Sequence, residues 1–237
     1  MNVRPRWWAQ LALPISMFIG YDTLCRLRPH TRADGLHNAY GMLHGWASVG
    51  LGQERAINNW VAGVHPASWF AARYYDIGHF GVTIAVLIAL YIWAPTSYRV
   101  MRDALWIVTA IALVVFWLHP LAPPRMLPGF HDVVGSITGS SDTSSDPSFY
   151  SAMPSLHMAW AVWSAVGLFA LLRRPWTRAL AVMHPVLTVF AVLATANHWA
   201  LDVIVGAVVA GAALAIRYGV TVIVVRLPRL APAAPNP

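Results

Sequence analysis

Uninterrupted apolar runs, several of them close to 20 residues long, constrain this chain more than any other feature. A helix rises about 1.5 Å per residue, so about 20 apolar residues cross a hydrocarbon core of ~30 Å. Hydrophobic residues make up 58% of the 237 residues and charged residues only 11%, whereas soluble domains carry about 25% charged residues. Helices satisfy their own backbone hydrogen bonds in lipid. The sequence therefore predicts an all-α polytopic membrane protein.

Six of these runs are candidates for transmembrane helices. We predict spans over residues 7–24, 74–93, 103–121, 155–172, 179–195 and 199–225. Residues 44–64, between the first and second spans, alternate apolar and polar side chains at helical spacing, which predicts an interfacial amphipathic helix. We expect one membrane domain over residues 1–227, with the functional motifs within about 70–215, and a disordered Pro- and Ala-rich tail over 228–237.

The arginines predict how the chain is oriented. The sequence has no lysine, and cytoplasmic loops of membrane proteins carry an excess of positive residues. Arginines gather before the first span, between the second and third, between the fourth and fifth, and after the sixth. We therefore predict a multi-pass protein of the plasma membrane with both termini cytoplasmic. The net charge of +7 fits arginines that face anionic lipid, so membrane lipids are the expected partners and nucleic acid is not. The sequence does not indicate an oligomeric state.

Two polar runs flank the fourth and fifth spans: Met153-Pro154-Ser155-Leu156-His157 and Asn197-His198-Trp199-Ala200-Leu201-Asp202. The chain crosses the membrane twice between them, so His157 and His198 are expected at the same, extracytoplasmic face. Asp202 follows His198 by four residues and shares its helical face. Other ionisable residues expected at this end are Asp22, Arg26, Asp76, His79, His119 and Arg125. Ionisable groups at membrane depth usually line a cavity, so we predict an active site here.

These residue types suit phosphoryl transfer. A carboxylate beside His198 would fix the imidazole tautomer and raise its basicity, and such a histidine can attack phosphorus to form a phosphohistidine. His157 can then protonate the leaving group as general acid. The phosphoryl oxygens need cations and N–H donors, for which Arg125 is the first candidate. Ser155, Arg26, Arg73 and the first turn of the fourth helix are further candidates.

The two motifs together resemble a known family. Pro154-Ser155-Leu156-His157 followed by His198-x-x-x-Asp202 is similar to the second and third signature motifs of the type 2 phosphatidic acid phosphatase superfamily. With Ala122-Pro123-Pro124-Arg125 upstream, the chain is most similar to the inositol phosphorylceramide synthase-like branch and its bacterial relatives. The resemblance implies a six-helix membrane fold and a lipid phosphate or phospholipid substrate. It also implies phosphohistidine catalysis without metal or cofactor, in which His198 is the nucleophile, Asp202 its orienting carboxylate and His157 the general acid.

The chain also departs from the family pattern. Ala191-Val192 stand where the phosphatases have a Ser-Arg pair upstream of the nucleophilic histidine. The family's first motif, a lysine followed later by Arg-Pro, is not clear either. This departure favours the synthase-like branch, and it leaves the phosphate-binding cations to be found elsewhere in the chain.

Three other functions compete with a lipid phosphatase or phosphotransferase. A transporter with a His/Asp proton relay would carry polar residues near mid-membrane, whereas these cluster at one face. An intramembrane serine protease would use Ser155 with a histidine, but the sequence has no Gly-x-Ser-x-Gly turn. A zinc hydrolase would take His157, His198 and Asp202 as ligands.

Overall fold

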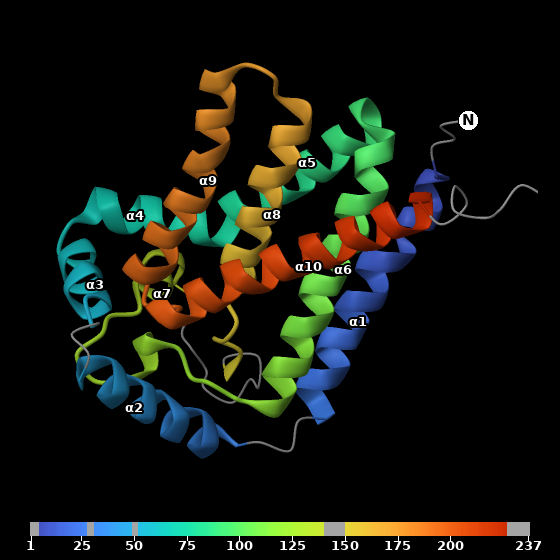
Figure 1. Cartoon of the computed structure of the whole chain (residues 1–237). Helices are drawn as coiled ribbons and strands as arrows, with labels where there is room; N and C mark the ends of the chain where they lie inside the picture. Colours follow the sequence, from blue (N-terminus) through green and yellow to red (C-terminus); the bar gives the residue numbers. More distant parts are fainter. Residues whose placement is uncertain (1–4, 28–30, 49–51, 140–149, 227–237) are drawn as a thin grey trace, which may run out of the picture.

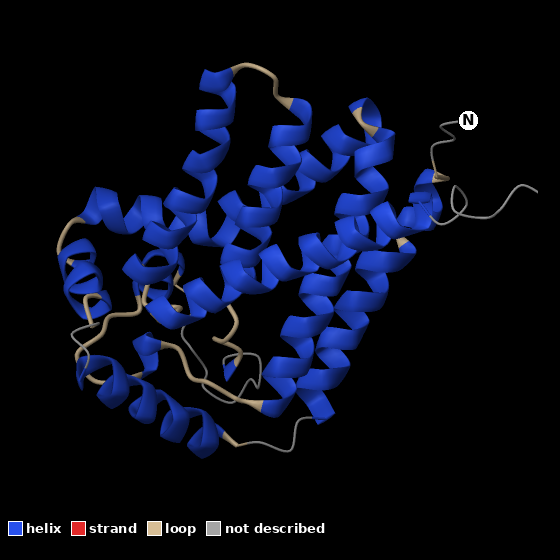
Figure 2. Ribbon diagram, in the orientation of Figure 1, coloured by secondary structure: helices blue, strands red, loops and turns tan. Residues whose placement is uncertain are grey.

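The computed structural model describes residues 5–27, 31–48, 52–139 and 150–226, and in these ranges the chain is helical (Figures 1 and 2). The one β-bridge among them joins Leu121 and Ser151. The predicted tail over 228–237 lies outside the described residues. The helices are η1 (Trp7–Gln10), α1 (Ala12–Leu27), α2 (Arg32–Ser48), α3 (Glu54–Ala62), α4 (His65–Arg73), the π-helical turn η2 (Tyr74–Gly78), α5 (His79–Trp93), α6 (Pro95–Leu118), η3 (Pro124–Met126), α7 (Val133–Thr138), α8 (Leu156–Leu171), α9 (Pro175–Ala194) and α10 (Ala200–Arg226).

Four helices in the described ranges are long and apolar enough to cross a membrane: His65–Trp93, Pro95–Leu118, Pro175–Ala194 and Ala200–Val220. The all-α membrane class predicted from the sequence is thereby confirmed. A shorter apolar helix, Leu156–Leu171, lies where the fourth span was predicted. The second span is longer than predicted because α4, η2 and α5 continue one another from His65 to Trp93.

Residues 44–64, where a single interfacial helix was expected, are divided between two helices. The helix α2 ends at Ser48 and α3 begins at Glu54. The short helix α3 is amphipathic, because Glu54, Asn58 and Val61 are buried at a spacing of four and three residues. Its burial against the rest of the molecule comes through polar side chains as well as apolar ones.

The helical bundle has two ends, each formed by different segments of the chain. The turns between α5 and α6 and between α8 and α9 lie at the same end as η1 and the last turns of α10 (Figure 1). At this end the Tyr91 hydroxyl donates to the Pro5 carbonyl at 2.9 Å, and Arg217 pairs with Asp103 at 2.9 Å. The helices α2, α3 and α7 gather at the opposite end. We call the first the inner end and the second the outer end.

The helix α8 lies among α5, α6, α9 and α10. Its Trp163 is fully buried, and the indole N–H donates to the Met101 carbonyl at 2.6 Å. The start of α8 approaches α10 closely, since the backbone N–H of Ser155 donates to the Asp202 carbonyl at 3.0 Å. A Cβ placed on Gly206 would clash with the Ser155 carbonyl oxygen. A residue without a side chain at position 206 therefore permits this backbone contact.

Candidate active site

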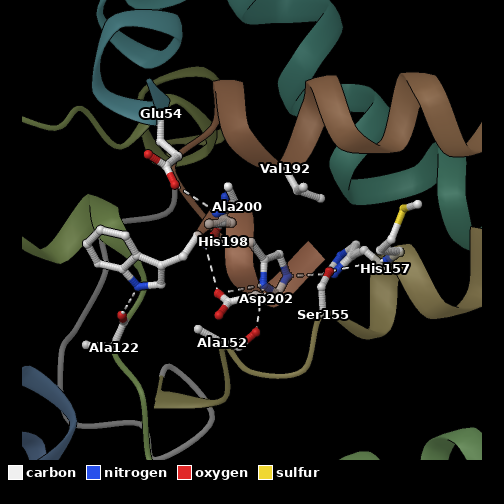
Figure 3. A network of polar contacts seen from close by, with 12 residues as sticks. Glu54, Ala122, Ala152, Ser155, His157, Val192, His198, Ala200 and Asp202 are labelled. Atoms are coloured by element: carbon white, nitrogen blue, oxygen red, sulfur yellow. Dashed lines mark hydrogen bonds and ion pairs between the residues drawn. The ribbon is translucent and has the colours of Figure 1, made fainter. Parts of the chain in front are cut away.

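The hydrogen bonds of His198 define its tautomer. Nδ1 of His198 lies 2.8 Å from the carbonyl oxygen of Ala152 (Figure 3). A carbonyl oxygen only accepts, so Nδ1 carries the proton and Nε2 carries the lone pair. Nε2 lies 3.2 Å from Nδ1 of His157, which must therefore donate. The ring of His198 is buried and lines a cavity, so a basic nitrogen is presented to that cavity by backbone geometry.

Asp202 supports this histidine from the side of Nδ1. Its Oδ2 lies 3.6 Å from Nδ1 of His198 and accepts the Trp199 backbone N–H at 2.8 Å. The carboxylate thus caps the first turn of α10. Asp202 is fully buried, and its Oδ1 has no hydrogen-bond partner. The sequence predicted the pairing of His198 with Asp202, but the shorter contact of Nδ1 is with the Ala152 carbonyl.

His157 is held between aromatic rings from the long helix that begins at His65. The Tyr75 ring stacks on it with centroids 4.4 Å apart and an interplanar angle of 19°. The His79 ring lies 4.0 Å away on centroids, and its Nδ1 donates to the Tyr75 carbonyl at 2.7 Å. These contacts fix the plane of the His157 imidazole and so direct its Nδ1–H toward His198.

Arg125 reaches the site from the loop after α6. Its backbone N–H donates to the Ala196 carbonyl at 2.9 Å, and its guanidinium donates to the side-chain oxygen of Asn197. Arg125 and Asn197 line the same cavity as the two histidines. A guanidinium that lines the same cavity as a basic imidazole nitrogen has the charge and the donors to receive phosphoryl oxygens.

The structure separates the other predicted residues from this arrangement. Ser155 is fully buried as the N-cap of α8, where its hydroxyl accepts the Met158 N–H at 3.3 Å. The Arg26 side chain is 76% exposed and pairs with Asp22 at 2.8 Å. Of the six further residues expected at this end, His79 and Arg125 line the cavity, whereas Asp22, Arg26, Asp76 and His119 are not among its lining residues.

The place of the missing Ser-Arg pair is filled by buried apolar side chains. Ala191 and Val192 are both 1% exposed. The Val192 carbonyl accepts the backbone N–H groups of Asn197 at 3.1 Å and of His198 at 3.3 Å. This part of α9 therefore shapes the loop that carries His198 through its backbone, and Arg125 supplies a cation from another segment.

The short helix α3 holds this loop at both of its ends, which the sequence did not reveal. Glu54, buried on α3, accepts the Ala200 backbone N–H at 2.9 Å, at the first residue of α10 (Figure 3). Asn58, one turn further, donates to the Ala194 carbonyl at 2.8 Å and to the His131 carbonyl at 3.0 Å. The contact of Glu54 with Ala200 joins residues 146 positions apart, and no local pattern signals it.

The geometry bears on two of the competing chemistries. A serine nucleophile needs access to substrate, whereas Ser155 is buried and its hydroxyl is engaged as a helix cap. A metal held by all three zinc candidates would need their ligand atoms to converge. Instead, Asp202 lies on the Nδ1 side of the His198 ring and His157 lies on its Nε2 side.

In the residues that the structure describes, the chain is a helical bundle with four helices of membrane-spanning length, and it brings two histidines and an arginine to one cavity. A family model described as the PAP2 superfamily matches residues 42–216, most of the 237-residue chain. The chain therefore belongs to the PAP2 superfamily, whose membership indicates a phosphatase or phosphotransferase acting on phosphate esters. No curated protein and no solved structure matches it in the comparisons made.

Proposed function

We propose that this protein is an integral membrane enzyme that cleaves or transfers the phosphate-ester head group of a lipid through a phosphohistidine on His198. One observation carries the proposal: His198 lines the cavity with Nδ1 held 2.8 Å from the Ala152 carbonyl oxygen and Nε2 3.2 Å from Nδ1 of His157. A lipid substrate is supported by the walls of that cavity, which are apolar along most of the length of α6.

The first half-reaction forms the covalent intermediate. The phosphoryl group enters between the two rings and replaces their hydrogen bond. The lone pair on Nε2 of His198 attacks phosphorus, and the bond from phosphorus to the leaving oxygen breaks. His157, protonated on both ring nitrogens in the substrate complex, gives its Nδ1 proton to that oxygen and becomes a neutral imidazole. The imidazole of His198 gains positive charge, which the Ala152 carbonyl and the Asp202 carboxylate stabilise. Arg125 binds the equatorial phosphoryl oxygens.

The second half-reaction releases the enzyme. The hydroxyl of water or of an acceptor alcohol attacks phosphorus, His157 takes its proton, and the bond between Nε2 and phosphorus breaks. Water yields a phosphatase, and an alcohol yields a phosphotransferase of the inositol phosphorylceramide synthase-like type. No step requires a metal ion. The resemblance around Ala122-Pro123-Pro124-Arg125 supports the transferase branch.

The proposed membrane setting follows from the same elements. We take α1 and α8 as spans in addition to the four longer helices, which gives six. The arginine-rich inner end faces the cytoplasm, because positive residues remain on that side. The histidine pair then lies at the extracytoplasmic face of the plasma membrane, and α2 and α3 lie along the interface.

The test compares purified wild type with His198→Asn and His157→Gln on a panel of lipid phosphates, with and without polyol acceptors. Asn at position 198 can still donate to the Ala152 carbonyl but has no nucleophilic ring nitrogen. We expect a loss of roughly 10⁴-fold or more for His198→Asn and roughly 10²- to 10⁴-fold for His157→Gln. An acid-labile phosphoprotein should be trapped in wild type and absent from His198→Asn.

The assay also distinguishes the branches of the proposal. Free phosphate measures hydrolysis, and labelled head group on the acceptor measures transfer. A chelator arm tests the proposed independence from metal, since retained turnover supports it. The catalytic assignment is wrong when both variants keep full activity on every substrate that the wild type turns over.

A further inference from the structure

The cavity that contains His157 and His198 continues along α6 as a groove. Its α6 lining extends from Phe116 at the outer end, through Leu113 and Leu105, to Arg102 and Tyr98 at the inner end. Tyr98 and Phe116 are 18 positions apart, which corresponds to about 27 Å of helix, close to the ~30 Å thickness of a hydrocarbon core. The volume of the whole cavity is about 730 Å³. The groove is thus long and runs across the membrane from the reactive end.

The walls of the groove are apolar, and two of them face outward. Pro14, Met17 and Phe18 of α1 form one wall, and Phe80 and Leu87 of α5 form another. Phe18 is 75% exposed and Phe80 is 47% exposed, although both line the groove. Their exposure indicates that the groove opens sideways between α1 and α5, where a membrane protein meets lipid tails.

A polar cluster stands at the inner end of the groove. Gln10, Tyr98 and Arg102, which we call the inner cluster, all line it. The Gln10 side-chain oxygen accepts from the Arg102 guanidinium and from the Tyr98 hydroxyl, the latter at 3.2 Å. Arg102 also donates to Asp103 at 2.9 Å. A hydrocarbon chain that pressed into this cluster would remove water from the Arg102 guanidinium and from its polar partners without offering them a hydrogen bond, which is unfavourable.

We propose that the groove binds one extended hydrocarbon chain of the substrate lipid, and that the inner cluster limits the length of chain that is accepted. The phosphate lies at Arg125 and His198, and the chain runs along α6 toward Arg102. This inference rests on the proposed function, since it places the tail of the lipid whose phosphate reacts. Each methylene that enters the groove is expected to raise kcat/KM by roughly fourfold, up to the length at which the chain meets the inner cluster.

The test uses single-chain alkyl phosphates of increasing length, at equal surface concentration in mixed micelles. For wild type, kcat/KM should rise with each added methylene and then stop rising. Leu113→Trp blocks the groove near the phosphate, and Leu105→Trp blocks it about 12 Å further along α6. The chain length at which kcat/KM stops rising should therefore be shortest in Leu113→Trp, intermediate in Leu105→Trp and longest in wild type.

Val114→Trp is the matched control, because Val114 neighbours Leu113 on the same helix but is 57% exposed and does not line the groove. It should reproduce the wild-type chain-length profile. Leu113→Phe and Leu105→Phe provide smaller blocks if either tryptophan variant unfolds. The rise in Tm on adding each alkyl phosphate gives the same comparison without turnover, since a ligand that binds the folded state stabilises it.

The outcomes separate this inference from the proposed function. Identical chain-length profiles in wild type and both groove variants, or a shorter limit in Leu105→Trp than in Leu113→Trp, would overturn the inference alone. Absence of His198-dependent phosphate release at every chain length would overturn the proposed function. In that case the Tm series would still decide whether the groove measures chain length.

Discussion

Two groups of ionisable side chains lie along α10, and they differ in what their charges contact. At the inner end, Asp103 accepts from Arg102 and from Arg217, and the side chains of Asp103 and Arg217 are 30% and 24% exposed. At the outer end, Asp202 is fully buried and interacts with a backbone N–H and with His198. The inner charges pair with one another in a cluster of two arginines and one aspartate, whereas the outer groups are held by backbone groups as well as by each other.

This difference distinguishes a structural ion-pair cluster from the candidate active site. Side chains of opposite charge that hydrogen-bond to each other have fewer donors and acceptors for a ligand. This applies to Asp103 and its arginine partners at the inner end. At the outer end the Ala152 carbonyl occupies Nδ1 of His198, and Nε2 contacts the His157 ring beside the cavity. Backbone partners therefore orient a side chain without neutralising it.

Among the variants that test the contrast between the inner and outer ends, we expect Arg125→Ala to cause the largest loss of kcat/KM. The guanidinium donates to Asn197, the neighbour of His198, and lines the same cavity, so its loss should lower kcat/KM by roughly 10²- to 10³-fold. Arg125→Lys should recover little, because lysine lacks the bidentate fork. Arg26→Ala tests the exposed arginine by the same assay. A larger loss for Arg26→Ala than for Arg125→Ala would move the phosphate site to α1.

Asp202→Asn is expected to have a smaller effect. The amide oxygen can still accept the Trp199 N–H, and the Ala152 carbonyl still fixes the tautomer of His198. We expect kcat to fall roughly 10- to 100-fold, less than the ~10⁴-fold seen where a carboxylate alone sets the tautomer. Steady-state kinetics measure kcat, and a melting curve measures Tm for the same variant. A loss near 10⁴-fold with unchanged Tm would show that the carboxylate dominates.

The next smaller effect on kcat and stability is expected for a substitution of Glu54 in α3. Glu54→Ala leaves the Ala200 N–H without its acceptor and should destabilise the protein by roughly 1–2 kcal/mol, with a several-fold loss of kcat as the loop loosens. Glu54→Gln retains an acceptor oxygen and should recover most of both. Gln53→Ala, on the exposed neighbour, is the control. Equal Tm and kcat in Glu54→Ala and Gln53→Ala would contradict a positioning role for Glu54.

The smallest effect is expected at the inner end. Arg217→Gln removes one partner of Asp103, and a partly exposed ion pair contributes about 0–1 kcal/mol. The Tm should fall by a few degrees at most, and phosphate release from a short-chain substrate should stay within about twofold of wild type. A loss comparable with that of Asp202→Asn would show that the two ends do not differ as described.

The sequence was sufficient to bring His157 and His198 together, because helix length relates residue number to membrane depth. It also placed Asp202 beside His198, because residues four apart share a helical face. The contacts that orient these groups come from distant segments. The Ala152 carbonyl, the Tyr75 ring and the Glu54 carboxylate depend on tertiary packing, which neither apolar periodicity nor motif spacing encodes.

Ser155 shows a different limit of sequence reasoning. A serine before a helix can present its hydroxyl to a ligand or use it to cap the helix, and both readings fit the same residues. In the structure the hydroxyl accepts the Met158 N–H. Likewise, the run from His44 to Val64 has helical periodicity, yet α2 ends and α3 begins within it, because buried polar contacts of Glu54 and Asn58 draw α3 toward the site.

The distance between His157 and His198 depends on a glycine, Gly206, that lies outside the site. It lies one turn beyond Asp202, away from the cavity, and contributes no functional group. The absence of a methyl group there lets the start of α8 rest on α10, and His157 follows two residues after Ser155. A Cβ atom at position 206 would push α8 and α10 apart. The distance between His157 and His198 would then change as well.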